Sequence, residues 1–471
     1  TYSTSGLYID SSLNADGCTQ VDSLDLTIYN ATTSIDVQSA CDSYVWIDGN
    51  TYTTSNNSAT YTLAGGNLNG CDSIITLNLS INQADTSYTN ITACDSVVWN
   101  GSTYTQSGTY SYSSSSIFSQ LGQDIDGEAP NDYSGVAVSL NYNGNIVAIG
   151  AKNNSNGTGH VRVYENINGS WIQLGQDIDG ESSGDHSGVS VSLSSNGYTL
   201  AIGATENDGN GTDAGHVRIY EYINSAWIQL GQDIDGESSP DESGKSVSLS
   251  SNGNIVAIGA WWNDANGDDA GHVRIYEYTN SSWIQLGQDI DGENIYDRSG
   301  ISISLSSNGY TLAIGATEND GNGADAGHVR VYNWSGTSWI QIGQDIDGEA
   351  PGDYSGRSVS LSSDGNTVAI GAHGNDGAAP DAGHVRIYNY NGSSWIQIGQ
   401  DIDGESSNNN SGASISISNN GNTVAIGAIN NDGNGAYSGH VRIYKYNNGS
   451  WIQIGQDIDG EAAGDESGCS V

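Results

Sequence analysis

The sequence predicts an all-β protein whose larger part is a β-propeller. The first observation is a repeat of 56 residues in which the tetrapeptide GHVR begins at Gly159, Gly215, Gly271, Gly327, Gly383 and Gly439. The second is that each repeat holds four short segments rich in Val, Ile, Tyr and Trp, separated by Gly and Asn turns. The third is the absence of long apolar stripes with helical period, so we expect almost no helix. Four antiparallel strands per repeat of this length are typical of a propeller blade.

The four strands of one blade are read from the second copy of the repeat. They are Ser190–Ser194, Thr199–Ala204, His216–Tyr222 and Ala226–Ile234. Asn196-Gly197 joins the first two and predicts a type I′ hairpin turn. The same dipeptide recurs at Asn252-Gly253, Asn308-Gly309 and Asn420-Gly421.

The two ends of the repeat region decide the blade count. Six complete sets of strands lie between an isolated fourth strand at Ile117–Ile125 and the beginning of a first strand at Ser467–Val471. We expect these two segments to form one split blade, which gives seven blades, with its other two strands beyond the chain; six blades are the alternative. The chain has no Met and starts and stops inside repeats, so we expect it to be a piece of a longer protein.

The stretch SGVSVSLSSNGYTLAIGA, at Ser187–Ala204, resembles the FG-GAP repeat of integrin-α-type propellers. That repeat has a Phe-Gly-x-Ser-Val strand, a calcium loop and a Gly-Ala-Pro ending. The pattern is matched here by Gly188, Ser190, Val191, Gly203 and Ala204. Ser187 replaces the Phe, Thr205 replaces the Pro, and the calcium loop is cut to the Asn196-Gly197 turn. The resemblance covers roughly residues 117–471 and implies the propeller fold more than the family's metal site.

The first 116 residues repeat with another period, of 50 to 53 residues. TYSTSG, TYTTSN and TYTQSG align, as do ACDSYVW and ACDSVVW. We expect β-rich, Ig-like or β-sandwich modules at residues 1–50 and 51–102, a Ser/Thr-rich linker at 103–116, and the propeller at 117–471. These modules look like the stalk units of large secreted surface adhesins from gliding and predatory bacteria.

Cysteine spacing suggests how the first two modules are cross-linked. Cys18 and Cys41 have the same separation as Cys71 and Cys94, and pairing them in this way leaves only Cys469 over. The alternative pair, Cys41 with Cys71, would leave Cys18 and Cys94 without partners. Disulfides in modules with so little core imply an oxidising, extracellular setting, so we expect a secreted or cell-surface protein.

Charge excludes several classes of partner. The chain has 55 acidic residues and 11 basic ones, for a net charge of -44. A nucleic-acid partner needs clustered Lys and Arg, and anionic lipid would repel such a chain. No run of about 18 apolar residues exists, so no segment is expected to span a membrane. High ionic strength or divalent cations suit such a surface.

Each repeat carries two acidic segments, which the strand order places on one face of the propeller. One reads DIDGExxxD, and its acidic residues stand at positions 1, 3, 5 and 9 of a loop, a pattern that suits Ca²⁺. The candidate ligands are Asp177, Asp179, Glu181 and Asp185; Asp233, Asp235, Glu237 and Asp241; Asp289, Asp291, Glu293 and Asp297; and Asp345, Asp347, Glu349 and Asp353. The alternative is a solvated acidic turn, because Gly occupies position 4 and not position 6. No organic cofactor is expected.

The other residues that every copy repeats have structural interpretations. His216 and Arg218 share one face of their strand, and zinc would need a second His or Cys nearby. We expect cross-strand hydrogen bonds for the His, Arg–Asp pairs between blades, and a Trp that caps the core between blades. No catalytic motif stands apart from the repeat, so no enzyme is expected.

One departure from the repeat indicates a binding surface. The third blade alone carries Trp261-Trp262 in one acidic loop and Ile295-Tyr296 in the other. Clustered exposed aromatic residues mark sugar or protein contacts, although local packing is the alternative. The sequence therefore favours a segment of an extracellular adhesin or surface fibre. It would attach to other cells, glycans or proteins, or self-assemble as a homo-oligomer. A lectin-like propeller is the first alternative and a propeller enzyme the second.

Overall fold

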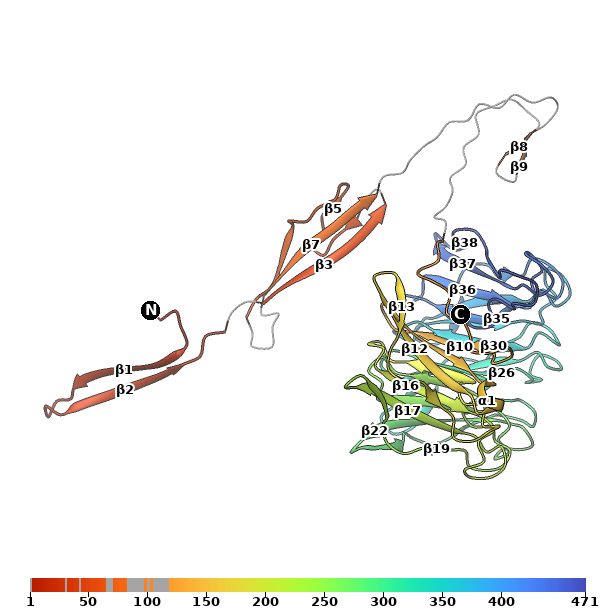
Figure 1. The fold of residues 1–471 in the computed structure, drawn as a ribbon, viewed down its shortest axis with the longest axis horizontal. Helices are drawn as coiled ribbons and strands as arrows, with labels where there is room; N and C mark the ends of the chain where they lie inside the picture. Colours follow the sequence, from red (N-terminus) through yellow and green to blue (C-terminus); the bar gives the residue numbers. More distant parts are fainter. Residues whose placement is uncertain are drawn as a thin grey trace. The chain divides into compact units, whose positions relative to one another are not determined.

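Strands make up nearly all the regular structure of the described residues, as the sequence predicts. The computed structural model describes residues 2–29, 32–41, 44–64, 71–82, 97–99, 102–104 and 118–471. Among these residues the only helix is the four-residue turn α1 (Asn154–Gly157), in which Ser155 and Asn156 have positive φ. No helix among the described residues is long and apolar enough to cross a bilayer. The chain divides into two units, Thr1–Tyr112 and Ser113–Val471 (Figure 1).

The first unit contains small sheets. They are formed by β1 (Gly6–Leu13) with β2 (Thr19–Leu26); β3 (Thr32–Cys41) with β7 (Ser73–Asn82) and β6 (Thr60–Leu63); β4 (Tyr44–Val45) with β5 (Thr51–Tyr52); and β8 (Val97–Trp99) with β9 (Ser102–Tyr104). β3 and β7 pair in parallel, whereas β6 and β7 pair antiparallel. A core of Trp46, Leu77 and Leu79 lies against this sheet. Cys18 is exposed in the β1–β2 connection. The side chains of Cys41 and Cys94 lie outside the described residues, so both disulfides remain predictions.

The described residues of the second unit, 118–471, form six sheets of the same design. The first three consist of β10 (Ser134–Leu140), β11 (Ile146–Ala151), β12 (His160–Ile167), β13 (Ser170–Gln173) and β14 (Ile178–Asp179); β15 (Ser190–Leu193), β16 (Thr199–Ala204), β17 (His216–Ile223), β18 (Ala226–Gln229) and β19 (Ile234–Asp235); and β20 (Ser246–Leu249), β21 (Ile255–Ala260), β22 (His272–Thr279), β23 (Ser282–Gln285) and β24 (Ile290–Asp291). The next three consist of β25 (Ser302–Leu305), β26 (Thr311–Ala316), β27 (His328–Trp334), β28 (Trp339–Gln341) and β29 (Ile346–Asp347); β30 (Ser355–Leu361), β31 (Thr367–Ala372), β32 (His384–Tyr390), β33 (Trp395–Gln397) and β34 (Ile402–Asp403); and β35 (Ser411–Ile417), β36 (Thr423–Ala428), β37 (His440–Asn447), β38 (Ser450–Gln453) and β39 (Ile458–Asp459). Each is a four-stranded antiparallel meander with a short fifth strand. This repetition is consistent with a propeller.

The predicted fourth strand is interrupted in every sheet. In the second sheet, β18 and β19 replace the single strand expected at Ala226–Ile234, and both pair with β17. Gly231 lies between them with a φ of 82°, which breaks the extended backbone. A Cβ at this glycine would lie 2.8 Å from Cδ1 of Trp283 in the next sheet. The break therefore leaves room for the indole of the neighbouring sheet.

The predicted type I′ turns are wrong. In the second sheet, Gly197 N donates to Ser194 O at 2.9 Å, and Gly197 has a φ of 77°, whereas Asn196 has no positive φ. A type I′ turn needs positive φ at both central residues, so this is a type I turn followed by a left-handed glycine. The Asn196 side chain stabilises it by accepting hydrogen bonds from Tyr198 N and Ser194 Oγ.

The core lies between neighbouring sheets, and the Trp of β23 joins two of them as expected. Trp283 is buried with residues of both the second and the third sheet. Its Nε1 donates to Leu230 O at 2.7 Å, and its backbone exchanges two hydrogen bonds with the Gln232 amide. The same contacts recur at Trp227, Trp339, Trp395 and Trp451. The repeated Leu/Ile-Gly-Gln sequence is thus the socket for the next Trp.

Both ends of the repeat region lie against the first sheet. Residues 118–128 form no regular strand, but Leu121 O accepts a hydrogen bond from Trp171 Nε1 at 2.7 Å. At the other end, Ser470 Oγ accepts one from Val138 N at 3.1 Å. Ser414 of the sixth sheet donates to Gly468 O at 2.6 Å. The C-terminal residues therefore connect the sixth sheet to the first.

Candidate functional site

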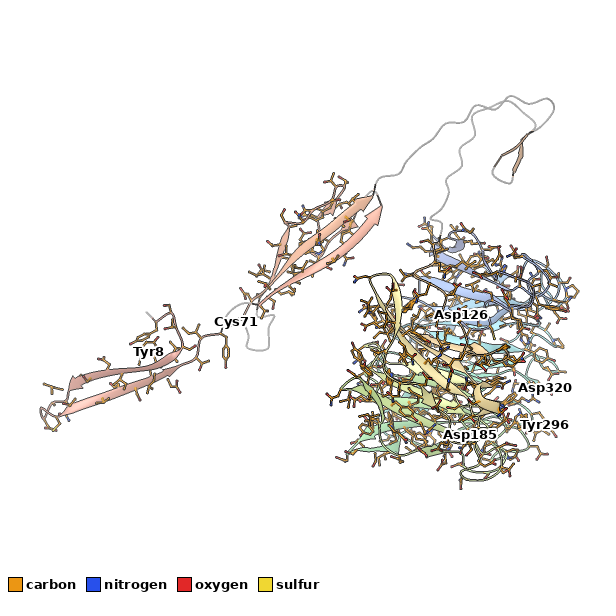
Figure 2. The ribbon with its side chains drawn as sticks, viewed as in Figure 1. Tyr8, Cys71, Asp126, Asp185, Tyr296 and Asp320 are labelled. Atoms are coloured by element: carbon orange, nitrogen blue, oxygen red, sulfur yellow. The ribbon has the colours of Figure 1, made fainter. Side chains whose placement is uncertain are left out.

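The two acidic segments of each repeat lie together, as the strand order predicts. Asn210, from one segment of the second sheet, donates through Nδ2 to Gly236 O at 2.8 Å and to Glu237 O at 3.2 Å, in the other segment. Equivalent bonds join Asn266 to Gly292, Asn322 to Gly348 and Asn434 to Gly460. Figure 2 shows the side chains of the second unit, with Asp126, Asp185 and Asp320 of the acidic segments labelled.

The four carboxylates of each predicted calcium loop are divided among different contacts. The ninth position closes its own loop: Asp185 Oδ2 accepts hydrogen bonds from Ser182 N at 2.9 Å and from Asn207 Nδ2 at 3.1 Å. Asp241, Asp297 and Asp353 accept equivalent backbone bonds. These aspartates are almost fully buried, and their hydrogen bonds account for the turn without an ion.

The first and fifth positions instead gather around the repeated histidines. The groups whose ligand atoms all lie within 4.8 Å are Glu128, His160 and Asp177; Glu181, His216 and Asp233; Glu237, His272 and Asp289; Glu293, His328 and Asp345; and Glu349, His384 and Asp401, with one further group. In the sixth sheet, His440 Nδ1 likewise lies 3.8 Å from Asp457 Oδ2. We call these the histidine clusters. Each takes its Glu from one copy of the acidic loop and its Asp from the next copy. Asp177 and Glu181, which share one loop, therefore belong to different clusters.

The third position also faces a histidine. His272 pairs in register with Asp291, and its Nδ1 lies 4.0 Å from Asp291 Oδ1 and 4.0 Å from Glu237 Oε2. Burial, and to a smaller degree Asp289, raises the pKa of Asp291. The cluster thus surrounds one imidazole nitrogen with mutually repelling carboxylates.

Four of the repeated histidines leave at least one buried ring nitrogen without the expected hydrogen bond among the described residues. His272 is fully buried, and among the described residues neither of its nitrogens has a hydrogen-bond partner. His160, His328 and His384 each leave Nε2 without one. Burial, with a smaller contribution from the Arg274 guanidinium, lowers the pKa of His272 to about 4. The imidazole is therefore neutral at neutral pH and offers a free lone pair.

The expected Arg–Asp pairs take a different form. Arg274 Nη2 donates to the backbone oxygen of Asp235 at 2.7 Å, and its Nη1 lies 3.4 Å from Glu237 Oε1. Arg274 thus joins two sheets through an Asp carbonyl and a Glu carboxylate, and not through an Asp side chain. The guanidinium also lies over the Tyr two residues on, as Arg274 does over Tyr276 at 5.7 Å.

A second site is formed by residues that differ from copy to copy. The residue before each Ser-Gly pair has a positive φ between 49° and 55°, although none is glycine; these residues are Tyr133, His186, Glu242, Arg298, Tyr354, Asn410 and Glu466. A left-handed backbone at a non-glycine residue costs about 1 kcal/mol or more and concentrates at functional sites. The backbone is copied at these positions, whereas the side chain is not.

These turn residues contact the loop that follows the second strand of the same sheet. His186 Nδ1 lies 2.9 Å from Glu206 Oε1, and Glu242 accepts a hydrogen bond from Trp261 Nε1 at 2.7 Å. The Tyr354 and His373 rings are 5.4 Å apart. Every sheet therefore places a different chemical pair at the same point of its fold.

Four cations gather beside these pairs. Six of the 11 basic residues are the repeated Arg of HVR, and four of the other five are Lys152, Lys245, Arg298 and Arg357, which we call the cation cluster. Burial lowers the pKa of Lys245, and next in effect is the Arg357 guanidinium, two sheets away; Lys152 and Arg298 add to it. Within the described residues, Lys152, Lys245 and Arg357 form no ion pair. Arg298 does form one, with its Nη1 at 2.6 Å from Glu318 Oε1. Sequence reasoning missed this cluster, although Lys245 and Arg357 stand where other copies carry Val189, Ile301 or Ala413.

The predicted aromatic patch joins this cluster through Trp261. The Trp261 and Trp262 rings stack at 5.2 Å, and Lys245 Nζ lies 4.4 Å from the Trp261 ring. Arg298 lies 5.1 Å from the same ring, so the loop at residues 294–298 reaches the Trp pair through this Arg. Ile295 and Tyr296 are about half exposed, and Ile295 covers Gly267.

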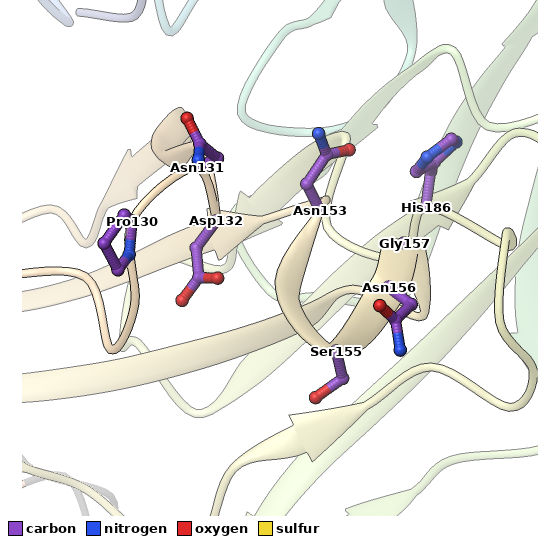
Figure 3. Close-up of a pocket in the computed structure, with 8 residues that line it drawn as sticks. All are labelled: Pro130, Asn131, Asp132, Asn153, Ser155, Asn156, Gly157 and His186. Carbon is purple, nitrogen blue, oxygen red and sulfur yellow. The ribbon is translucent and has the colours of Figure 1, made fainter.

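Two polar pockets open beside the cation cluster. One, of about 540 Å³, lies at α1, with Asp132 and His186 on opposite sides of that turn (Figure 3). The other, of about 410 Å³, is lined by Tyr133, Lys152, Asn153, His186, Val189, Thr205, Glu206, Glu242 and Lys245. It spans the first three sheets, and its half-buried lysines share the lining with Glu206 and Glu242, so it offers charges of both signs to a polar ligand.

Comparison with known proteins identifies one motif. No curated protein matches the chain. Among solved structures, it is similar to a putative 6-phosphogluconolactonase from Bacteroides uniformis (13% identity, TM-score 0.49, covering 69% of this chain and 85% of that one). It is also similar to hydrazine synthase from Kuenenia stuttgartiensis (10% identity, TM-score 0.42, covering 66% and 83%). The family model of the FG-GAP repeat matches residues 346–388, from β29 into β32. The chain therefore contains an FG-GAP repeat within its series of four-stranded β-sheets.

Proposed function

We propose that the chain is a non-catalytic binding segment of an extracellular adhesin or surface fibre, in which the sheets are a scaffold and the cation cluster contacts the ligand. The observation that carries this proposal is the contrast between copied and varied residues. The Trp sockets and histidine clusters recur from sheet to sheet, whereas the seven left-handed turn residues include five residue types, with only Tyr and Glu used twice. A recognition surface needs such variation, and a scaffold does not.

The proposed scaffold is a ring of seven blades. Residues 118–128 take the place of a fourth strand beside Trp171, and residues 467–471 take that of a first strand beside Val138. The seventh position would hold both segments, between the sixth sheet and the first. In a six-bladed ring, the alternative, the sixth sheet would pack directly on the first.

Glycans are the ligand class that the cation cluster favours. In a chain of net charge -44, cations without carboxylate partners attract an acidic group, such as a uronate or a sulfate. Trp261 and Trp262, both half-buried, add aromatic surface beside these cations for a sugar ring. These contacts also favour the second candidate, a lectin-like propeller that acts without a fibre.

Calcium at the acidic loops remains part of this proposal. Their carboxylates suit Ca²⁺ in type, although the ninth position is occupied by hydrogen bonds. Thermal unfolding in chelator and then in millimolar Ca²⁺ tests it. A rise in melting temperature beyond that caused by Mg²⁺ supports calcium binding, and an equal rise with both ions contradicts it.

A glycan array tests the binding function. The full chain is applied to matched neutral, uronate-bearing and sulfated glycans, beside the variant Trp261→Ala. We expect acidic glycans to be retained and the variant to bind them more weakly. If the full chain binds no glycan, or the variant binds equally well, the proposed ligand site is wrong.

A further inference from the structure

We propose that each histidine cluster binds one divalent ion of the first transition series, such as Zn²⁺, through the imidazole and through carboxylates from two successive copies of the acidic loop. The proposal is independent of the proposed glycan binding, but it uses the carboxylates of the calcium proposal, so Ca²⁺ and a transition-metal ion are alternatives at these positions. It concerns the junctions between sheets, where His272, Asp289 and Asp291 of the third sheet meet Glu237 from the preceding crossover.

The buried imidazole distinguishes these clusters from ordinary acidic surface. His272 is fully buried, and both nitrogens lack a hydrogen-bond partner among the described residues. An unsatisfied buried polar group is costly; at Nδ1 this cost falls on His272, whereas His160, His328 and His384 carry it at Nε2. A metal ion at Nδ1 would remove it for that nitrogen and would also neutralise the repulsion between the surrounding carboxylates.

The distances allow one ion to be shared. Two ligand atoms, each about 2.0–2.2 Å from Zn²⁺, can lie at most about 4.4 Å apart. His272 Nδ1 is 4.0 Å from both Glu237 Oε2 and Asp291 Oδ1. In the sixth sheet, His440 Nδ1 is 3.8 Å from Asp457 Oδ2 and 3.9 Å from Asp459 Oδ1. The half-exposed Glu and Asp need only small side-chain rotations to approach a tetrahedral arrangement.

Neighbouring groups position the ligands and decide the class of ion. Arg274 Nη1 lies near Glu237 Oε1, which leaves Oε2 on the side of the imidazole. A set of one nitrogen and several carboxylate oxygens suits Zn²⁺ and its transition-metal neighbours, whereas Ca²⁺ takes oxygen ligands. Because the Glu comes from the crossover between two sheets, the ion would hold those sheets together.

Metal counting on the full chain tests the proposal. After dialysis against buffered Zn²⁺, elemental analysis should find six ions per chain, one for each cluster. The triple variant His272→Gln, His328→Gln and His384→Gln should retain three. Glu277→Gln, a carboxylate change at the far end of the same strand as His272, is the matched control and should retain six.

A second triple variant guards against misfolding. Asp289→Asn, Asp345→Asn and Asp401→Asn preserve side-chain shape and should also halve the zinc content, with an unchanged circular dichroism spectrum. Zinc absent from the parent chain overturns the proposal. So does zinc that is lost from the Asp variant and retained by the His variant, because such a site would use carboxylates alone.

Discussion

At the scale of single residues, the repeated glycine of the Leu/Ile-Gly-Gln socket has two roles. Gly231 needs its positive φ to interrupt the fourth strand, and its missing side chain leaves space for Trp283. Gly336 has a similar φ of 94°, but no atom lies within 4 Å of the Cβ position. A comparison of substitutions at these two glycines therefore separates the cost of backbone strain from the cost of a clash.

Gly231→Ala should destabilise the second unit more than Gly336→Ala does. Strain at positive φ costs about 1–2 kcal/mol in either variant, and the clash with Trp283 adds about 1–3 kcal/mol in the first. Urea unfolding followed by Trp fluorescence measures both. Equal losses of unfolding free energy would show that the indole does not depend on the glycine.

The buried histidines predict a loss of stability in mild acid. Since the pKa of His272 is about 4 when folded and near its ordinary 6.5 when unfolded, the unfolded chain binds more protons between these values. His328 and His384 have the same lowered pKa. The contribution of these neutral histidines to the free energy of unfolding should be full above pH 6.5. It should fall as the pH drops toward 4, by about 3 kcal/mol for each such histidine. The groups facing His272 are Arg274, Glu237, Asp241, Asp289 and Asp291.

Urea unfolding in chelator, from about pH 7.5 to about pH 5, measures this dependence. Asp291 acts in the opposite sense. Because its pKa is raised in the folded state, the folded chain takes up this proton more readily, and stability gains from that protonation as the pH falls. The triple variant His272→Gln, His328→Gln and His384→Gln should show a flatter pH profile. A profile as steep as that of the parent would contradict the assignment.

At the scale of strands and loops, the sequence pattern predicts where strands lie better than it predicts the geometry of turns. The bounds of β16 agree with the predicted Thr199–Ala204, because a short apolar run between turn residues defines a strand that is buried on both faces. The predicted type I′ turn is wrong, since the Asn196 backbone keeps a negative φ while its side chain accepts a hydrogen bond within the turn. The break in the fourth strand depends on a Trp in the next sheet, and the histidine clusters join residues from two copies. Such contacts between repeats cannot be read within one repeat.

The ninth position of the acidic loop gives a prediction at this scale. Asp353 Oδ2 accepts hydrogen bonds from Glu349 N, Ala350 N and Asn375 Nδ2, and the sixth copy uses Asn409 at this position. Asp353→Ala should lower the unfolding free energy by about 1–3 kcal/mol, because buried donors lose their acceptor. Asp353→Asn should cost less than half as much by the same urea assay. Equal costs would show that the loop does not need an acceptor there.

At the scale of the whole molecule, charge should make folding dependent on salt. A net charge of -44 destabilises the compact chain through self-repulsion, which salt screens. The melting temperature should therefore rise with NaCl over the range in which screening increases. A melting temperature that stays constant or falls would mean that the described ion pairs outweigh the general repulsion.

Uneven charge also underlies the proposed function. An acidic chain places four of its five basic residues outside the HVR repeat in one cluster, across several sheets, and the fifth, Lys445, lies exposed on β37. The sequence alone could not predict this, because the residues are separated by up to four repeats. Their meeting depends on the arrangement of the sheets.

The most direct test is the affinity of the full chain for an acidic glycan, measured beside the double variant Lys245→Ala and Arg357→Ala and the single control Lys445→Ala. We predict that the double variant loses at least about tenfold in affinity, because two charge-assisted contacts disappear. The control should bind like the parent chain. Equal affinities for all three would contradict a binding site at the cation cluster.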